Sequence, residues 1–448
     1  MNTPTIKEKK RKPRVVAGLT PYTGTFSKEQ ITHLLKRTMF GAKKADIDFF
    51  MGKTLTEAIN TLLTEPAALT DAQLPLRNYV EGTLPLGGTW AYAQQDGNFD
   101  GQRRNSLKIW WVGNMANQPR SIFEKMVLFW HNHFATGMLD SFSTMSFEHV
   151  LLLRKHALGN FKSLTKDITL DANMLYYLNG YLNKKSAPDE NYARELQELF
   201  TLGKGPNAQY TEADVKAAAR LLTGWKFGRA QEEIPIGSGK YYWKVSVATA
   251  DHDTAPKQFS AFYDNKVITN TANTEGGALK ELDDMLDMIF AKDEVALYIC
   301  RRIYRFFVYY DIDATIETEI ITPLAVLFRA ANYDIKPVLK ALFSSEHFFE
   351  TGLKACLIKS PLENTVGLVR EFNIVLPTIT TTPATQVTAM YNALNNLVSN
   401  ASTQGQYIGD PPNVSGWAAY YQEPGYHENW INTDTFPKRL VLDRKSVV

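Results

Sequence analysis

The sequence predicts a mainly α-helical protein, a multi-helical globular array with a small β-hairpin or sheet insertion at about residues 226–272. Two observations predict this fold class. Apolar residues recur at helical spacing in most segments of the 448-residue chain, and helix-capping patterns precede several of these segments. Aromatic and β-branched residues follow a Gly-Ser-Gly turn in one place, and we expect strands only there.

Capping patterns indicate where three of the helices begin. Residues 27–30, 54–57 and 211–214 each place a Ser or Thr three residues before an acidic or amide side chain, which is the capping-box arrangement. Pro66 and Gly224 end the second and third of these segments. Helical spacing predicts further helices over about 106–117, 122–131, 147–158, 191–202, 278–290, 295–307, 316–331, 335–342, 362–370 and 385–398, with loops at 84–101 and 404–432 and a linker at 378–383.

Composition excludes several classes of protein. A chain with 44% hydrophobic and 12% aromatic residues has enough apolar surface for a sizeable core, so it is not disordered throughout. The net charge of +2 and the lack of a clustered basic face disfavour nucleic acid as a partner. No window of about 18 apolar residues predicts a membrane span. Cys300 and Cys356 lie in apolar helical segments and are predicted to be buried thiols, with a single disulfide as the alternative.

The segment Phe-Trp-His-Asn-His-Phe at 129–134 is the first candidate site. His131 and His133 lie two residues apart, or ~200° around an α-helix, so they face one target only if the helix ends between them. Such imidazoles could bind a divalent metal or relay a proton. The alternative is a pair of histidines hydrogen-bonded within an aromatic core.

A polar stripe in an apolar context is the second candidate. On a helix, Asn191, Glu195 and Glu198 fall at positions i, i+4 and i+7, with Arg194 beside them. If these carboxylates are buried they need partners, and two of them held close together have proton affinities that differ, as an acid/base pair requires. The alternative is an ion-pair network that locks helices together.

Two further segments carry polar or aromatic residues in turns. His252 and Asp253 follow the predicted strand and could belong either to a metal or acid/base element or to a polar turn. Residues 410–417 combine a Pro-Pro pair with a turn and end at Trp417, and Trp430 follows. Asn413, Trp417 and Trp430 are therefore candidate ligand-binding residues, unless this loop is a rigid plug packed on the helices.

Several segments together resemble a bacterial family, domain of unknown function 1800 (DUF1800), in order and spacing. The most specific are Trp-His-Asn-His-Phe at 130–134 and Asn-Tyr-Ala-Arg-Glu at 191–195. The others lie at 33–41, 210–225, 252–253, 306–307, 359–363 and 411–417, and the match covers roughly residues 27–440. The resemblance implies a mostly helical protein with no agreed mechanism, often encoded beside a protein that looks like a sulfatase or alkaline phosphatase. Such a protein is the partner that we expect.

The expected organisation is a basic disordered tail at 1–24, a single DUF1800-like helical domain at 25–440, and a C-terminal end at 441–448 from which a short segment could be missing. Many relatives of such proteins are exported, as the resemblance implies. The basic run at 7–14 is not followed by the apolar segment of a signal peptide. We therefore expect a cytoplasmic location by default, with export as the alternative.

Two functions fit these features. The first is a hydrolase-type enzyme in which His131, His133, Asn191, Arg194, Glu195 and Glu198 form a buried polar site. A divalent metal could be held there by His131, His133, Glu195, His252 and Asp253. The second is a non-catalytic helical binding or scaffold protein that partners the sulfatase- or phosphatase-like protein. The enzyme hypothesis depends on His131 and Glu195 meeting in one water-accessible cavity.

Overall fold

The predicted fold class is confirmed: a computed structural model of the chain is mainly helical with two small antiparallel sheets. It describes residues 17–82, 84–231, 240–270, 272–377, 384–417 and 430–445. The predicted linker at 378–383, most of the predicted tail and residues 418–429 of the predicted loop lie outside these ranges.

The α-helices are α1 (Lys28–Thr38), α2 (Lys44–Phe50), α3 (Leu55–Leu62), α4 (Asp100–Ala116), α5 (Phe123–His133), α6 (Ser143–Lys155), α7 (Phe161–Thr169), α8 (Ala172–Tyr177), α9 (Asn191–Glu195), α10 (Glu212–Leu221), α11 (Glu275–Phe290), α12 (Asp293–Phe307), α13 (Ala314–Ile316), α14 (Thr322–Ala330), α15 (Ile335–Phe343), α16 (Pro361–Glu371), α17 (Ala384–Thr403) and α19 (Thr435–Lys445).

The helices begin where their capping residues predict. The Ser27 side chain accepts a hydrogen bond from the Glu29 backbone N–H at the start of α1. Thr54 and Thr211 form complete capping boxes at α3 and α10. Each cap satisfies a backbone donor that the helix itself cannot pair, and each therefore fixes the first residue of its helix.

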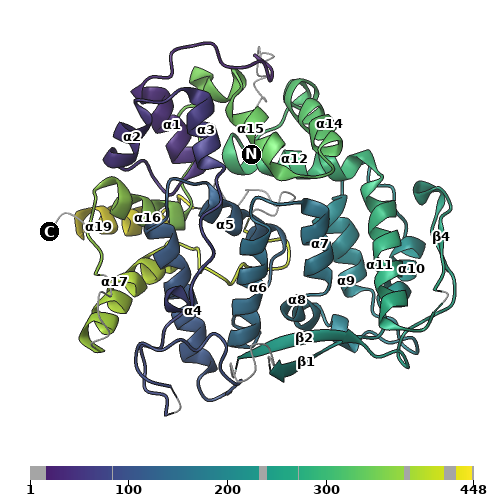
Figure 1. Cartoon of the computed structure of the whole chain (residues 1–448). Coiled ribbons are helices and arrows are strands. Elements are labelled where there is room, and N and C mark those ends of the chain that lie inside the picture. Colours follow the sequence, from purple (N-terminus) through teal and green to yellow (C-terminus); the bar gives the residue numbers. More distant parts are fainter. Residues whose placement is uncertain are drawn as a thin grey trace, which may run out of the picture.

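Helices α4, α5 and α6 pack together in the middle of the molecule, and the other helices surround them (Figure 1). Helices α16 and α17 pack on α4. The N-terminal segment lies against residues 344–353: the Tyr22 backbone N–H donates to the Ser344 carbonyl at 2.8 Å, and Arg37 donates to the Leu353 carbonyl at 2.8 Å. Segments more than 300 residues apart in the sequence thus share one contiguous apolar core.

The predicted strand region is confirmed. Strand β1 (Trp225–Gln231) pairs antiparallel with β2 (Tyr241–Val247), and this hairpin packs against α6 and α8 (Figure 1). A second pair, β3 (Lys257–Gln258) and β4 (Val267–Ile268), completes the insertion.

Helices also occur where the sequence analysis did not predict them, and π-helical segments occur where it predicted uninterrupted α-helix. Helices α2, α7, α8 and α19 were not predicted; α2 and α8 are only 7 and 6 residues long, too short for a clear apolar period. The predicted helices at 191–202 and 316–331 each contain a π-helical segment, Leu196–Thr201 and Glu317–Ile321. In the second, the wider turn precedes Pro323, which lacks the N–H that a continuous α-helix requires.

Both cysteines are free thiols, so the alternative of a disulfide is wrong. Cys300 is buried as predicted. Cys356 is only half-buried, and its thiol lies 3.3 Å from an Arg37 guanidinium nitrogen.

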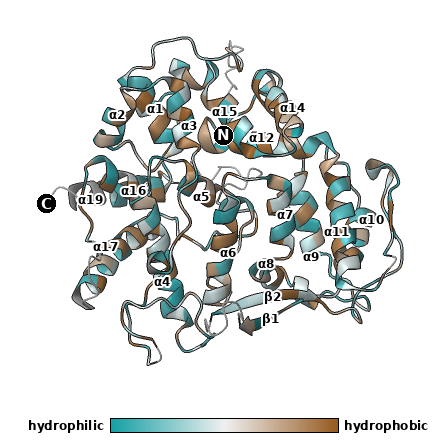
Figure 2. Ribbon diagram, viewed as in Figure 1, coloured by the Kyte–Doolittle hydropathy of each residue, from teal (hydrophilic) through white to brown (hydrophobic). Residues whose placement is uncertain are grey.

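In the described part of the chain, no helix is both long and apolar enough to cross a membrane. Figure 2 shows hydrophilic residues interspersed with hydrophobic ones along the helices.

Buried ion pairs connect elements that pack side by side. Arg103 of α4 donates to both carboxylate oxygens of Glu81, and both side chains are about 1% exposed. Arg154 of α6 donates to both oxygens of Glu124 of α5. Because an unpaired buried charge is costly, each pair fixes the two segments that carry it.

Replacing Glu81 with Gln should destabilise the protein by about 3–5 kcal/mol, because Arg103 would stay buried without a counter-charge. Urea unfolding measures this change. Glu65→Gln is the matched control, since Glu65 pairs with Lys336 at the surface and should contribute less than about 1 kcal/mol. Equal effects of the two substitutions would contradict the assignment of Arg103–Glu81 as a structural pair.

Candidate functional site

The two histidines of the Trp-His-Asn-His-Phe segment point to different sides of α5. The helix continues through both residues, so it does not end between them. His131 contacts Trp111 of α4, with ring centroids 5.0 Å apart, whereas His133 Nε2 lies 2.9 Å from the Phe200 carbonyl oxygen. The structure therefore does not bring His131 and His133 together.

His133 stabilises the end of the π-helical segment. Its Nε2 and the Tyr298 hydroxyl bind the carbonyl oxygens of Phe200 and Leu199, the latter at 2.8 Å. Carbonyls in a last helical turn have no partner within the helix, so such side chains take that place. Burial, followed by the charge of Arg302, holds the pKa of His133 well below its usual value, and the ring is neutral. Nδ1 of the same ring is buried without a hydrogen-bond partner among the described residues.

His131 belongs to a buried polar group with His149 of α6 and Trp111. The two imidazole centroids are 6.0 Å apart. Nε2 of both histidines and Nε1 of Trp111 are buried without a hydrogen-bond partner among the described residues. Burial, then the charges of His149 and Lys108, lowers the pKa of His131 to about 3, so this imidazole is also neutral at physiological pH.

Sequence reasoning missed His149 and its partner Asp171. His149 Nδ1 lies 2.8 Å from Asp171 Oδ2, which also accepts the Met174 backbone N–H as the N-cap of α8. The Asp-Ala-Asn-Met segment at 171–174 is a helix-start pattern that could have revealed this residue. The contact holds in place the start of α8, a helix that ends at Tyr177.

A buried ion pair joins α4 to the loop that follows α17. The Lys108 ammonium, about 1% exposed, binds the Asp410 carboxylate and lies 3.4 Å from the centroid of the Tyr407 ring. The other Asp410 oxygen accepts the Leu139 backbone N–H at 2.8 Å. Asp410 is thus held by a cation and by a backbone donor from the segment that follows α5.

The same loop binds the end of α5 directly. The Asn132 side-chain oxygen accepts the Trp417 backbone N–H, and Gly416 packs so closely that a Cβ there would overlap the Asn132 carbonyl oxygen. The φ of Gly416 is +80°, a conformation that favours glycine. The Trp-His-Asn-His-Phe segment and residues 411–417, separated by some 280 residues, therefore form one packed unit.

The three residues predicted to bind a ligand differ in their surroundings. Trp417 is 8% exposed and packed. Asn413 is exposed, and its side-chain oxygen accepts the Ser415 backbone N–H at 2.8 Å. Trp430 is half-buried, and its carbonyl accepts from Arg439 at 3.1 Å. Around Trp417 the loop matches the packed plug considered above, and the ligand-binding role stays a prediction.

The predicted polar stripe is divided by the π-helical segment. Arg194 lies at the surface, where it forms a two-pronged pair with Glu212 at 2.6 and 2.8 Å and binds Glu190 at 2.9 Å. The Asn191 amide donates to the Leu178 carbonyl at 3.2 Å and so connects α9 to the end of α8. Glu198 pairs with Lys204. A π turn is wider than an α turn, so it changes the angular spacing of side chains on which the prediction of a single polar stripe relied.

Glu195 differs from these neighbours because one of its carboxylate oxygens has no partner. Oε2 is buried and accepts no hydrogen bond from a described residue, while the residue as a whole is partly accessible. Burial, then repulsion from Glu198, raises the pKa of Glu195 to about 7, and the charges of Lys204 and Arg194 oppose this shift without cancelling it. The carboxyl can therefore gain or lose a proton near neutral pH.

Tyr177 connects Glu195 to the Asp410 loop. Burial, then the negative charges of Asp140, Asp410 and Glu195, raises the pKa of the Tyr177 phenol. A Cβ at Gly137 would lie 3.0 Å from Asp140, 3.5 Å from Tyr177 and 3.8 Å from Asp410, so these side chains surround Gly137. We call Asp140, Tyr177, Glu195 and Asp410 the acidic face. Sequence reasoning missed Tyr177 because it did not predict α8.

Different neighbouring charges shift the pKa values of His131 and Glu195. The charges that shift the pKa of His131 are those of His149 and Lys108, and those that shift the pKa of Glu195 are Glu198, Lys204 and Arg194. Lys108 acts on His131 and binds Asp410, and the charges of Asp410 and Glu195 both act on Tyr177. The shared cavity expected from the sequence thus has no counterpart in these contacts.

His252 and Asp253 lie in a separate network in the insertion. His252 binds the Thr223 carbonyl at 2.7 Å and Glu281 at 2.9 Å, and Lys257 binds Glu281 at 2.6 Å. Asp253 pairs with Arg220 at 2.7 Å. Both ring nitrogens of His252 are therefore engaged. Across the described ranges, no group of three or more His, Cys, Asp or Glu side chains is arranged to hold a metal ion, so the geometry gives no support to the predicted metal site.

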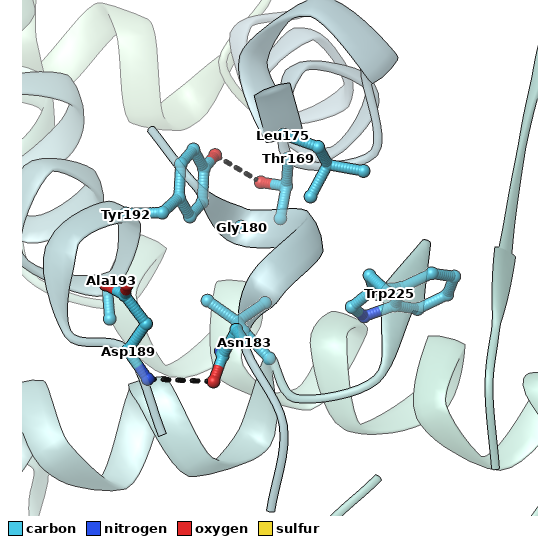
Figure 3. A pocket seen from close by; sticks show the side chains of 9 residues that line it. Thr169, Leu175, Gly180, Asn183, Asp189, Tyr192, Ala193 and Trp225 are labelled. Atoms are coloured by element: carbon cyan, nitrogen blue, oxygen red, sulfur yellow. Dashed lines mark hydrogen bonds between the residues drawn. The ribbon is translucent and has the colours of Figure 1, made fainter. Parts of the chain in front are cut away.

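A small cavity lies between α8, α9 and the start of β1 (Figure 3). It is bordered by the Tyr192–Thr169 hydrogen bond of 2.8 Å and by Asn183, whose side-chain oxygen accepts the Asp189 backbone N–H. Its volume of about 10 Å³ is at the lower limit for a single water. It is too small for an organic substrate, so the acidic face is the better candidate site.

Gly416→Ala should weaken the packing of the Asp410 loop on α5. The new methyl group would overlap Asn132 and add backbone strain of about 1–2 kcal/mol. Limited proteolysis and Trp fluorescence report the release of the loop. Gly405→Ala is the control, because Gly405 has φ +100° with no atom within 4 Å of a Cβ, so only the strain applies. Equal loop release in the two variants would contradict this packing.

Glu195→Gln should become more stable relative to the wild type as pH rises from about 4.5 to 7. The folded protein holds the Glu195 proton more tightly than the unfolded chain does, so the wild type loses stability across this window and the Gln variant does not. Urea unfolding at several pH values measures the difference.

Glu212→Gln should show the opposite sign. Its hydrogen bond with Arg194 lowers the pKa of Glu212. The wild type therefore gains stability from the ionised group at neutral pH and loses it as pH falls below about 4.5.

A pH-independent difference in stability between Glu195→Gln and the wild type would contradict the Glu195 prediction, because it would show that Glu195 has an ordinary pKa.

Comparison with known proteins is consistent with the resemblance seen in the sequence. Comparisons with curated proteins and with solved structures find no match. The family model described as "Protein of unknown function (DUF1800)" matches residues 33–446, nearly the whole chain. The chain belongs to the DUF1800 family.

Proposed function

We propose that this protein is a hydrolase-type enzyme whose acid/base chemistry takes place at the acidic face. Glu195 transfers the proton, Asp410 supplies a carboxylate that Lys108 and the Leu139 N–H hold in place, and the Tyr177 phenol is close enough to both for their charges to act on it. The observation that carries the proposal is the contrast between the two carboxylates. Glu195 has an unpartnered oxygen and a pKa of about 7, whereas Asp410 is held by Lys108 and the Leu139 N–H.

Such a contrast is what acid/base catalysis requires. A general acid or base works best when its pKa is close to the working pH, and a second carboxylate that stays ionised can stabilise positive charge or activate water. Partial accessibility allows Glu195 to reach a substrate. Carboxyl groups with no such task are usually paired, as Glu212 and Glu190 are.

The π-helical segment after Glu195 also supports the proposal. π-turns are rare and occur frequently at functional sites. Here the turn begins at Leu196, directly after Glu195, and includes Glu198, which raises the pKa of Glu195. The proposal thus keeps Glu195 and Glu198 from the sequence-based set, adds Tyr177 and Asp410, and assigns His133 and Arg194 to structural contacts. It depends on no metal ion.

A second candidate function is a non-catalytic helical scaffold for a sulfatase- or alkaline-phosphatase-like partner. The buried pairs Arg154–Glu124 and Lys257–Glu281 favour it, since such networks rigidify a helical body. In that case the polar residues have structural roles, and no variant at the acidic face would change a turnover rate.

A panel of chromogenic p-nitrophenyl esters, phosphates, sulfates and glycosides tests the enzyme. Glu195→Gln should lower turnover of the accepted class by about 10²–10⁴-fold, the usual contribution of a general acid or base. Glu212→Gln should leave turnover unchanged, and the wild-type pH profile should include a group near pH 7.

Absence of turnover of every class by the folded wild type would contradict the hydrolase and favour the scaffold. Equal turnover in the wild type and Glu195→Gln would remove Glu195 from the mechanism.

A further inference from the structure

A second polar cavity lies between the start of α2 and the ends of α4 and α16, and it shares no lining residue with the acidic face. Its volume is about 60 Å³, several times the 10–15 Å³ that one water needs. Lys43, Asn117, Arg370 and Asn373 contribute polar groups to its lining. The cavity is therefore large enough for a small polar ligand.

Positive charge around this cavity exceeds the negative charge that opposes it. Arg370 binds Asp46 at 3.0 Å, and Arg120 binds the other oxygen of the same carboxylate at 2.9 Å. Lys43, which also lines the cavity, forms no ion pair among the described residues. Two guanidinium groups thus share the Asp46 carboxylate, and the Lys43 ammonium adds a third positive charge at the cavity. The nearby Glu371 does not compensate, because it faces two other lysines.

The buried guanidinium is incompletely compensated. Arg370 is 6% exposed, and it donates to the carbonyls of Ala116 and Gln118 at 3.0 and 3.4 Å, which carry no charge. Burial lowers its pKa, and Asp46 offsets only part of this effect. A further anion would therefore stabilise the charged form.

An unpartnered polar atom of a lining residue also indicates a ligand. Nε of Arg370 is buried without a hydrogen-bond partner among the described residues. Both side-chain amide atoms of Gln118, whose backbone carbonyl binds Arg370, are unpartnered as well, although Gln118 does not line the cavity. Buried polar atoms are nearly always paired, with protein, water or a ligand. The exposed Asn373 has φ +52°, and its side-chain amide is available as a further donor.

We propose that this cavity binds a small tetrahedral oxyanion: phosphate, sulfate or the terminal phosphate of a monoester. Arg370 supplies the buried charge, while Lys43 and Asn373 supply donors that can reach a ligand from solvent. Guanidinium and ammonium groups are the usual partners of such anions. This site is independent of the acidic face, so either proposal can fail without the other.

The test compares thermal unfolding of the full chain in sodium phosphate, sodium sulfate, glycerol phosphate and sodium chloride at equal ionic strength. An oxyanion at about ten times its Kd should raise the Tm by about 1–2 °C more than chloride does. A larger rise with glycerol phosphate than with phosphate would identify a phosphate monoester as the ligand, and the reverse would identify the free ion.

Lys43→Met and Asn373→Gly should each reduce this rise, and glycine keeps the positive φ at position 373. Lys44→Met is the matched control, because Lys44 is exposed, pairs with Asp48 and does not line the cavity. The proposal is overturned if phosphate and sulfate stabilise the wild type no more than chloride does. It is also overturned if Lys43→Met responds as fully as Lys44→Met.

Discussion

The buried Lys108–Asp410 ion pair is the contact on which the candidate site depends most. It joins α4, in the centre of the molecule, to a loop some 300 residues later in the chain. A lysine that is about 1% exposed needs a counter-charge, so the loop has to lie where Asp410 can supply it. Because Asp410 also accepts the Leu139 N–H, the same contact holds the segment that follows α5. Three separate parts of the sequence thus meet at one side chain.

The polar residues of the specific sequence segments separate into two kinds once their partners are known. His252, Arg194 and Asp253 have their charges or ring nitrogens bound by carbonyls or by opposite charges, and such residues hold elements together. His133 binds the Phe200 carbonyl through Nε2, while its Nδ1 is buried without a partner among the described residues. Glu195 retains an unpartnered, buried oxygen beside accessible surface. Burial and Glu198 keep its proton bound near neutral pH, a property that a fully paired carboxylate does not have.

The sequence predicted the fold well because capping boxes and helical periodicity are local signals, and residues such as Thr54 and Thr211 act locally. It predicted the site less well. The pair His131 and Glu195 was chosen from local segments, but which segments meet depends on long-range contacts such as Asn132 with Trp417.

Tyr177 was missed because α8 is a six-residue helix with no apolar period of its own. The π turn after Glu195 also has no local signature, since the hydrogen bonds that define it depend on packing.

The central claim is tested most directly by titrating the Glu195 carboxyl in the folded wild-type protein. Carbon-detected NMR resolves this carboxyl, and the Glu195→Gln variant assigns its signal. The account predicts a midpoint near pH 7, since burial and the neighbouring Glu198 both oppose ionisation. A midpoint near the usual glutamate value of about 4.5 would contradict it, because Glu195 would then be an ordinary ionised side chain with no proton to transfer at neutral pH.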